Sequence, residues 1–92
     1  MGQSPVAGGN AATLLDARGM RCPLPIVHLA RLARTLSAGD RIVLLTDDPA
    51  AKVDIPAWCR LRGHDLVSTE EYREAAGPPA IRSEVRLGAP GT

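Results

Sequence analysis

Aromatic residues are almost absent from this chain. The 92 residues include no phenylalanine, one tryptophan and one tyrosine. Proteins that bind single-stranded nucleic acid usually stack the bases on aromatic side chains. The formal net charge is only +1, from eleven basic and ten acidic residues, and gives no overall attraction to a polyanion. We therefore expect no direct nucleic-acid partner.

Cysteine is scarce as well, and the chain contains no Cys-x-x-Cys pair. Of the two cysteines, Cys22 is followed three positions later by Pro25, where a thioredoxin-like motif would carry its second cysteine. This disfavours internal disulfide exchange and favours chemistry that uses a single thiol. Cys59 is the other cysteine.

Long apolar runs are also missing. No stretch reaches the length of a membrane span, and residues 1–17 show no basic segment followed by an apolar one. The sequence predicts a cytoplasmic protein without a membrane contact, in a compartment where cysteines stay reduced.

The length and composition favour one small domain. A chain of 92 residues has room for a single core, and its fractions of 45% hydrophobic and 23% charged residues are typical of globular proteins. Residues 1–11 and 89–92 are small, polar or rich in glycine and proline, so we expect flexible tails there. Residues 12–88 form the predicted domain.

The hydrophobic pattern predicts four strands and two helices. Residues 12–16 form a short apolar run, expected to be a buried first strand. Residues 23–36 are expected to form a helix that places most of its apolar side chains on one face. Residues 41–46 contain a continuous run of isoleucine, valine and leucine between Arg41 and Thr46, as in a strand buried on both faces.

In the second half of the chain, proline and glycine residues indicate where helices and loops begin and end. Asp48 is expected to cap a helical turn that begins at Pro49, and Pro56 to start or kink the main second helix, which ends at Gly63. Residues 65–69 read as a third strand, 70–79 as a loop, and 81–87 as an exposed-face or edge strand. The predicted fold class is α+β, a two-layer βαβαββ sandwich with both helices on one face of a mixed four-stranded sheet.

The stretch Gly19 to Pro25 joins the first strand to the first helix and carries Cys22. With Cys22 as the N-cap, Pro23 and Pro25 occupy the first and third helical positions, where a missing N–H costs little. The N–H of Leu24 is then the main backbone donor left for the sulfur. The helix dipole and Arg21 predict an exposed Cys22 with a pKa below the ordinary value of about 8.5. A buried, inert cysteine is the alternative.

Four residues of the first helix suggest a surface for a partner. Leu24 and Val27 are apolar but fall on its polar side, near Arg31 and Arg34. They form either a docking patch beside Cys22 or an ordinary solvated helix face.

The remaining polar residues have structural explanations. Asp47 and Asp48 fit a turn at the end of a strand better than acid–base or metal chemistry, and Asp54 fits the start of the second helix. Cys59, beside Trp58, fits a partly buried structural thiol. The spacing of His28 and His64 relative to the cysteines matches no compact zinc pattern, so we expect no metal.

These motifs together resemble the TusA-type, or SirA-like, family of sulfur carriers. The resemblance covers residues 15 to about 87. It rests on Leu15-Asp16, Gly19-Met20-Arg21-Cys22-Pro-Leu-Pro25, Gly39-Asp40, Thr46-Asp47-Asp48-Pro49-Ala50, Asp54-Ile55-Pro56, Trp58-Cys59 and Gly63-His64-Asp65-Leu66, in that order. The chain departs from the family pattern in its N-terminal tail and at Gly77-Pro78-Pro79.

The resemblance implies a fold like that of the C-terminal domain of translation initiation factor 3. It also implies that Cys22 accepts sulfur as a persulfide from a cysteine desulfurase or a rhodanese-type donor and passes it to an acceptor protein, with Arg21, Arg31 and Arg34 as docking candidates. The persulfide is then the only transient group, and no other cofactor is expected. The resemblance implies a relay, and we expect the chain to be monomeric in isolation. Relatives serve tRNA thiolation, molybdenum-cofactor supply or sulfur oxidation. A non-catalytic regulatory or RNA-binding module with the same fold is the alternative.

Overall fold

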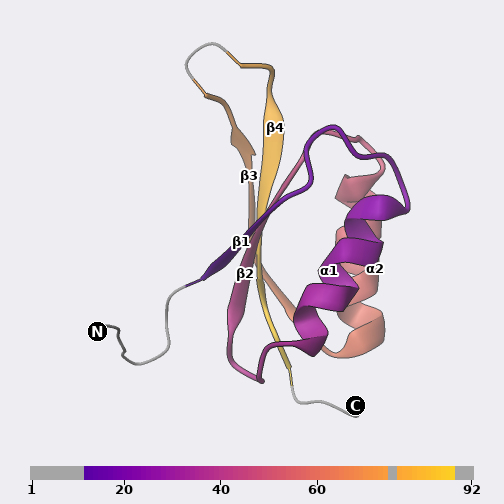
Figure 1. Ribbon diagram of the computed structural model, residues 1–92, viewed down its shortest axis with the longest axis vertical. Coiled ribbons are helices and arrows are strands. Elements are labelled where there is room, and N and C mark those ends of the chain that lie inside the picture. The colour runs from indigo at the N-terminus through magenta and orange to yellow at the C-terminus, as the bar shows by residue number, and fades with distance from the viewer. Residues whose placement is uncertain (1–11, 75–76, 89–92) are drawn as a thin grey trace.

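The computed structural model describes residues 12–74 and 77–88, and within them the predicted order of elements is confirmed (Figure 1). The elements are β1 (Thr13–Asp16), α1 (Leu24–Arg34), β2 (Arg41–Thr46), α2 (Ala51–Arg62), β3 (Asp65–Tyr72) and β4 (Ala80–Arg86). The sheet order is β1-β2-β4-β3, with β1 and β2 parallel and β4 antiparallel to both of its neighbours. Both helices cover one face of the sheet, which confirms the predicted two-layer α+β architecture (Figure 1).

Strand β2 lies inside the sheet and is buried on both faces, as its continuous apolar run predicts. Ile42 and Leu44 are fully buried in the core that the helices cover. Val43 and Leu45 alternate with them and are also buried, opposite Glu84 and Arg82 of β4. A strand that is buried on both faces of the sheet has apolar side chains on each face. Its sequence therefore shows no alternation of polar and apolar residues.

Strand β4 is an interior strand, so of its two predicted forms, exposed-face or edge, the edge position is wrong. It pairs with β2 on one side and β3 on the other. Its sequence alternates because Ser83 and Val85 are buried, whereas the charged residues that alternate with them form ion pairs with neighbouring strands. These pairs are Arg82 with Glu70 (3.4 Å), Glu84 with Arg41 (2.9 Å) and Arg86 with Asp65 (3.1 Å).

Two other strands differ from their predicted form. Strand β1 lies at the edge of the sheet and is only half-buried, with Leu14 62% exposed, because a single neighbouring strand covers it. Strand β3 continues to Tyr72, through residues predicted as loop, because its acidic end pairs with β4. The predicted tails at 1–11 and 89–92 and residues 75–76 of the predicted loop lie outside the described residues.

Helix α2 begins at Ala51, earlier than the predicted start at Pro56, which lies inside it. The turn expected at Pro49 leads directly into the helix, since Ala51 N–H donates to the Asp48 carbonyl at 2.9 Å. Ile55, Trp58 and Cys59 bury one face of α2 in the core, and this packing outweighs the loss of one backbone hydrogen bond at Pro56. No helix in residues 12–74 and 77–88 is long and apolar enough to cross a membrane.

The parallel pairing of β1 and β2 determines where the cysteine lies. Each of these strands is followed by a helix on the same face, so the β1–α1 and β2–α2 loops meet at one end of the sheet (Figure 1). The N-termini of both helices point to that end.

Candidate functional site

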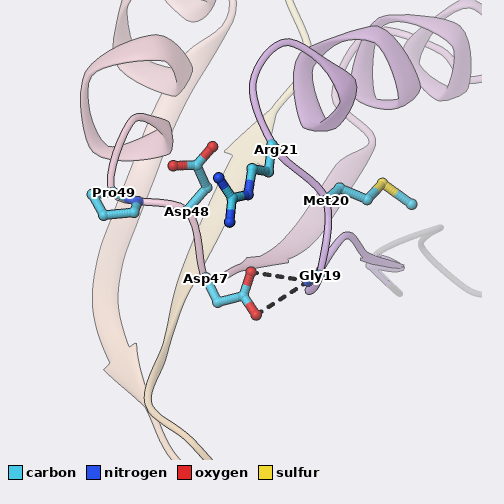
Figure 2. Close-up of a pocket in the computed structure, with 6 residues that line it drawn as sticks. All are labelled: Gly19, Met20, Arg21, Asp47, Asp48 and Pro49. Atoms are coloured by element: carbon cyan, nitrogen blue, oxygen red, sulfur yellow. Dashed lines mark hydrogen bonds between the residues drawn. The ribbon is translucent and has the colours of Figure 1, made fainter.

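Two aspartates that follow β2 hold the loop that carries Cys22. The carboxylate of Asp47 accepts the N–H of Gly19 through both oxygens, at 2.9 and 3.1 Å (Figure 2). Gly19 has a φ of 86°, a conformation that glycine adopts at little cost. Asp48 accepts the N–H of Cys22 at 2.8 Å and that of Ala50 at 3.1 Å. The two loops are therefore fixed to each other by side chains.

The sequence interpretation found only part of this role. The bond from Ala50 to Asp48 agrees with the predicted turn, but the contacts to Gly19 and Cys22 were missed. A signal for them was available, because residues that follow two adjacent parallel strands meet at the same sheet edge. An aspartate pair after one strand therefore faces the glycine loop after the other.

Cys22 is not the N-cap of α1, contrary to the prediction. The first helical residue is Leu24 and the cap position is Pro23, whose carbonyl accepts the N–H of Val27 at 3.0 Å. The N–H of Leu24 donates to the Arg21 carbonyl at 2.8 Å and is not available to the sulfur. Pro25 is buried within the first turn, and the Cys22–Pro23 peptide bond is cis. Cys22 therefore lies one residue outside the helix.

The thiol of Cys22 is exposed, as predicted, but its pKa is raised, so the predicted lowering is wrong. The largest cause is a hydrogen bond to the side chain of Asp54, followed by desolvation and the charges of Asp54 and Asp48. Asp54 lies within the first turn of α2, not ahead of the helix start as predicted. The predicted pKa of Cys22 took into account the dipole of α1 and the charge of Arg21, but not the carboxylate of Asp54 on α2.

Cys59 has the structural character that its position beside Trp58 predicts. Cys59 is only 2% exposed, and burial raises the pKa of its thiol to about 11. A thiol in this state is a poor nucleophile at neutral pH. Cys22 is the exposed thiol of the two.

The predicted docking residues are at the surface of α1 and the loop before it. Leu24 is 47% exposed, Val27 is half-buried, and Arg21, Arg31 and Arg34 are exposed. In residues 12–74 and 77–88 these three arginines form no ion pair or side-chain hydrogen bond, whereas Arg18, Arg82 and Arg86 of the sheet side do. The charges of α1 are therefore free to meet a partner.

A cavity of about 440 Å³ opens between the two loops (Figure 2). Its lining consists of Gly19, Met20, Arg21, Asp47, Asp48 and Pro49. The guanidinium of Arg21 extends toward the two aspartates (Figure 2). The backbone bonds from Cys22 and Ala50, and then the charge of Arg21, lower the pKa of Asp48, which stays ionised at neutral pH.

Comparisons with known proteins agree with this geometry. The family model described as Sulfurtransferase TusA matches residues 13–77. The chain is also similar to the crystal structure of a SirA-like protein from Desulfitobacterium hafniense, with a TM-score of 0.64 and 21% sequence identity over 83% of this chain and 97% of that one. The structural likeness confirms the fold, and the family match favours a sulfur carrier over an RNA-binding module.

Proposed function

The chain belongs to the TusA sulfurtransferase family, and we propose that it carries sulfur as a persulfide on Cys22 from a donor protein to an acceptor protein. The observation that carries this proposal is the exposed thiol of Cys22 at the meeting point of the two loops. The other cysteine is buried and cannot serve as a resolving thiol without opening the core.

Loading is an exchange between a thiol and a persulfide. The sulfur of Cys22 attacks the terminal sulfur of the donor's persulfide, and the donor's S–S bond breaks. The donor leaves as a thiolate and takes up the proton that Cys22 has lost. The oxidation state of the transferred sulfur does not change, so the reaction requires no metal or redox cofactor.

We propose a cysteine desulfurase or a rhodanese-type protein as the donor, with a docking surface formed by Arg21, Leu24, Val27, Arg31 and Arg34. Support comes from the unpaired charges of α1 and from Leu24, which is exposed next to the cysteine. The same transfer serves tRNA thiolation, molybdenum-cofactor supply and sulfur oxidation, and the proposal concerns the transfer itself.

The first prediction concerns which cysteine is loaded. After incubation with a cysteine desulfurase and cysteine, intact-mass measurement should show one added sulfur atom on the wild type and on Cys59→Ser, and none on Cys22→Ser. The physical reason is the exposure of Cys22 and the burial of Cys59. Equal loading of the two single variants would contradict the assignment.

A further inference from the structure

The cavity between the two loops carries charges of both signs. Arg21 lines it from the cysteine's own loop, and Asp47 and Asp48 line it from the loop after β2. The guanidinium of Arg21 extends toward the two carboxylates (Figure 2), yet it forms no ion pair or side-chain hydrogen bond with any residue in 12–74 and 77–88. The cavity therefore separates charges that can each bind a ligand group of opposite sign.

Both carboxylates keep part of their hydrogen-bonding capacity for a ligand. Asp47 accepts one donor, the N–H of Gly19, and Asp48 accepts two backbone N–H groups, one of them from Cys22. An ionised carboxylate offers about four acceptor positions, so each aspartate can accept a further donor. The backbone bonds also hold the two carboxylates in place, which lowers the cost of ordering them around a ligand.

This charge pattern fits a small zwitterion. An ammonium group can bind Asp47 and Asp48 while a carboxylate binds Arg21, both through charge-assisted hydrogen bonds. The volume of about 440 Å³ lies within the range of roughly 300–1,000 Å³ that is typical of small-molecule sites. A free α-amino acid carries both charges on one carbon, whereas a residue inside a partner's polypeptide has lost both to peptide bonds. The cavity therefore fits a free amino acid better than a side chain of a partner protein.

The position of Cys22 indicates which amino acid. Cys22 follows Arg21 in the chain, and its N–H donates to Asp48 at 2.8 Å. Its thiol is exposed. In cysteine persulfide, a single CH₂ group separates the sulfur atoms from the carbon that carries both charges. A molecule held by Arg21 and the aspartates can therefore bring its terminal sulfur to Cys22.

We propose that the cavity binds the zwitterionic group of free cysteine persulfide, which then loads Cys22 directly. The inference rests on the proposed function and deepens it by adding a small-molecule donor. The thiolate of Cys22 attacks the terminal sulfur of the bound persulfide, and the S–S bond of the persulfide breaks. Free cysteine leaves with the electron pair as a thiolate and takes up the proton that Cys22 has lost, so the step requires no oxidant or reductant.

Binding is tested by NMR on the full chain with an unreactive probe, S-methyl-L-cysteine. We expect a saturable shift of the amide signals of Gly19, Cys22 and Ala50, because their N–H groups donate to the two aspartates. The N-acetyl derivative of the probe lacks the ammonium group and its methyl ester lacks the carboxylate, so each should bind several-fold more weakly. Equal binding of the three compounds would overturn the inference.

Two variants assign the two charges of the probe. Arg21→Gln should weaken binding of S-methyl-L-cysteine several-fold and remove the preference over the methyl ester, because the ester has no carboxylate for Arg21 to bind. Asp47→Asn should reduce the preference over the N-acetyl derivative. The matched controls are Arg62→Gln and Asp65→Asn, which remove equal charges at the opposite end of the sheet. Equal losses of preference in the controls would assign the effect to net charge and refute the site.

Loading is compared by intact mass in a Cys59→Ser background, with cysteine persulfide and N-acetylcysteine persulfide as separate donors. The parent should gain sulfur several-fold faster from cysteine persulfide, and Arg21→Gln should lose this preference. Glutathione persulfide carries its zwitterionic group farther from the sulfur and should load no faster than the N-acetyl donor. Equal rates from the first two donors, or a preference for glutathione persulfide, would refute the assignment to cysteine persulfide.

Failure of the proposed function gives a different result. If a cysteine desulfurase loads Cys22 while the chain shows no preference among the small donors, the carrier function stands and the inference about the cavity is wrong. If S-methyl-L-cysteine binds as expected but Cys22 gains sulfur from neither the desulfurase nor the persulfides, the carrier function and the loading step are both refuted, and only the amino-acid site remains.

Discussion

At the scale of single residues, the chemistry of Cys22 shows what a sequence can and cannot reveal. The exposure of Cys22 and the helix that follows it were predicted, because Arg21, Cys22 and this helix are consecutive in the chain. Asp54 belongs to the other helix, and its effect on the pKa of Cys22 depends on how α2 packs and on its start at Ala51. The direction of the pKa shift was therefore beyond local reasoning, which expected the opposite sign.

His64 provides a pH-dependent contact away from the site. Its Nδ1 accepts the N–H of Gly88 at 2.9 Å, and its ring lies 4.7 Å from that of Trp58. Burial, and then the charge of Arg62, lowers its pKa, so the unfolded chain binds the proton more tightly than the folded one. The free energy of unfolding should be fully maintained above the ordinary histidine pKa of about 6.5 and fall as the pH drops through the lower pKa of the folded state.

Chemical denaturation of the wild type, His64→Gln and His28→Gln across this pH range tests the linkage. We expect His64→Gln to flatten the pH dependence and His28→Gln to leave it as in the wild type. An unchanged slope in His64→Gln would show that another group titrates.

Gly88 tolerates no side chain, because a Cβ atom there would collide with the backbone carbonyl of Gly63. Gly88→Ala should lower the free energy of unfolding by about 1–3 kcal/mol, the usual cost of overpacking. Gly77→Ala is the matched control, since its Cβ would meet Glu74 at an ordinary distance of 3.6 Å. Urea denaturation measures both variants, and equal stabilities would refute the clash.

At the scale of elements, pattern reasoning succeeded where one physical cause dominates. The apolar run of β2 and the apolar face of α1 follow directly from burial. The edge position of β1, the interior position of β4 and the extension of β3 follow from cross-strand pairing, which involves residues distant in sequence. The start of α2 was misplaced because Pro56 suggested a boundary, whereas the core contacts of Ile55 and Trp58 keep the helix continuous.

Helix α1 carries the charges that the docking proposal requires. Replacing Arg31 and Arg34 together by glutamate should slow loading by a cysteine desulfurase several-fold at low salt, because exposed charges mainly steer encounter. Added salt should narrow the difference from the wild type. Single-turnover loading followed by mass measurement provides the rates.

The control variant replaces Arg73 and Arg86 together by glutamate, which matches the change in net charge. Arg73 is exposed and lies just after β3, outside the proposed surface. Equal slowing by both double variants would assign the effect to overall charge and would refute a docking role for α1.

At the scale of the whole molecule, the topology creates the site. Parallel β1 and β2, each followed by a helix on the same face, bring the Cys22 loop, the two aspartates after β2 and the first turn of α2 to one end of the sheet. The order of elements and the family resemblance predicted this architecture. The contacts of Asp47 and Asp48 across that end required the three-dimensional structure.

The most direct test of the account is to locate the transferred sulfur on the wild-type chain. After a single turnover with a cysteine desulfurase, the carrier is digested without reductant and its peptides are analysed by mass spectrometry. We expect one additional sulfur atom on the peptide that contains Cys22, and we expect it to disappear when an acceptor protein is added. Sulfur located on the Cys59 peptide, or a carrier that gains no sulfur, would contradict it.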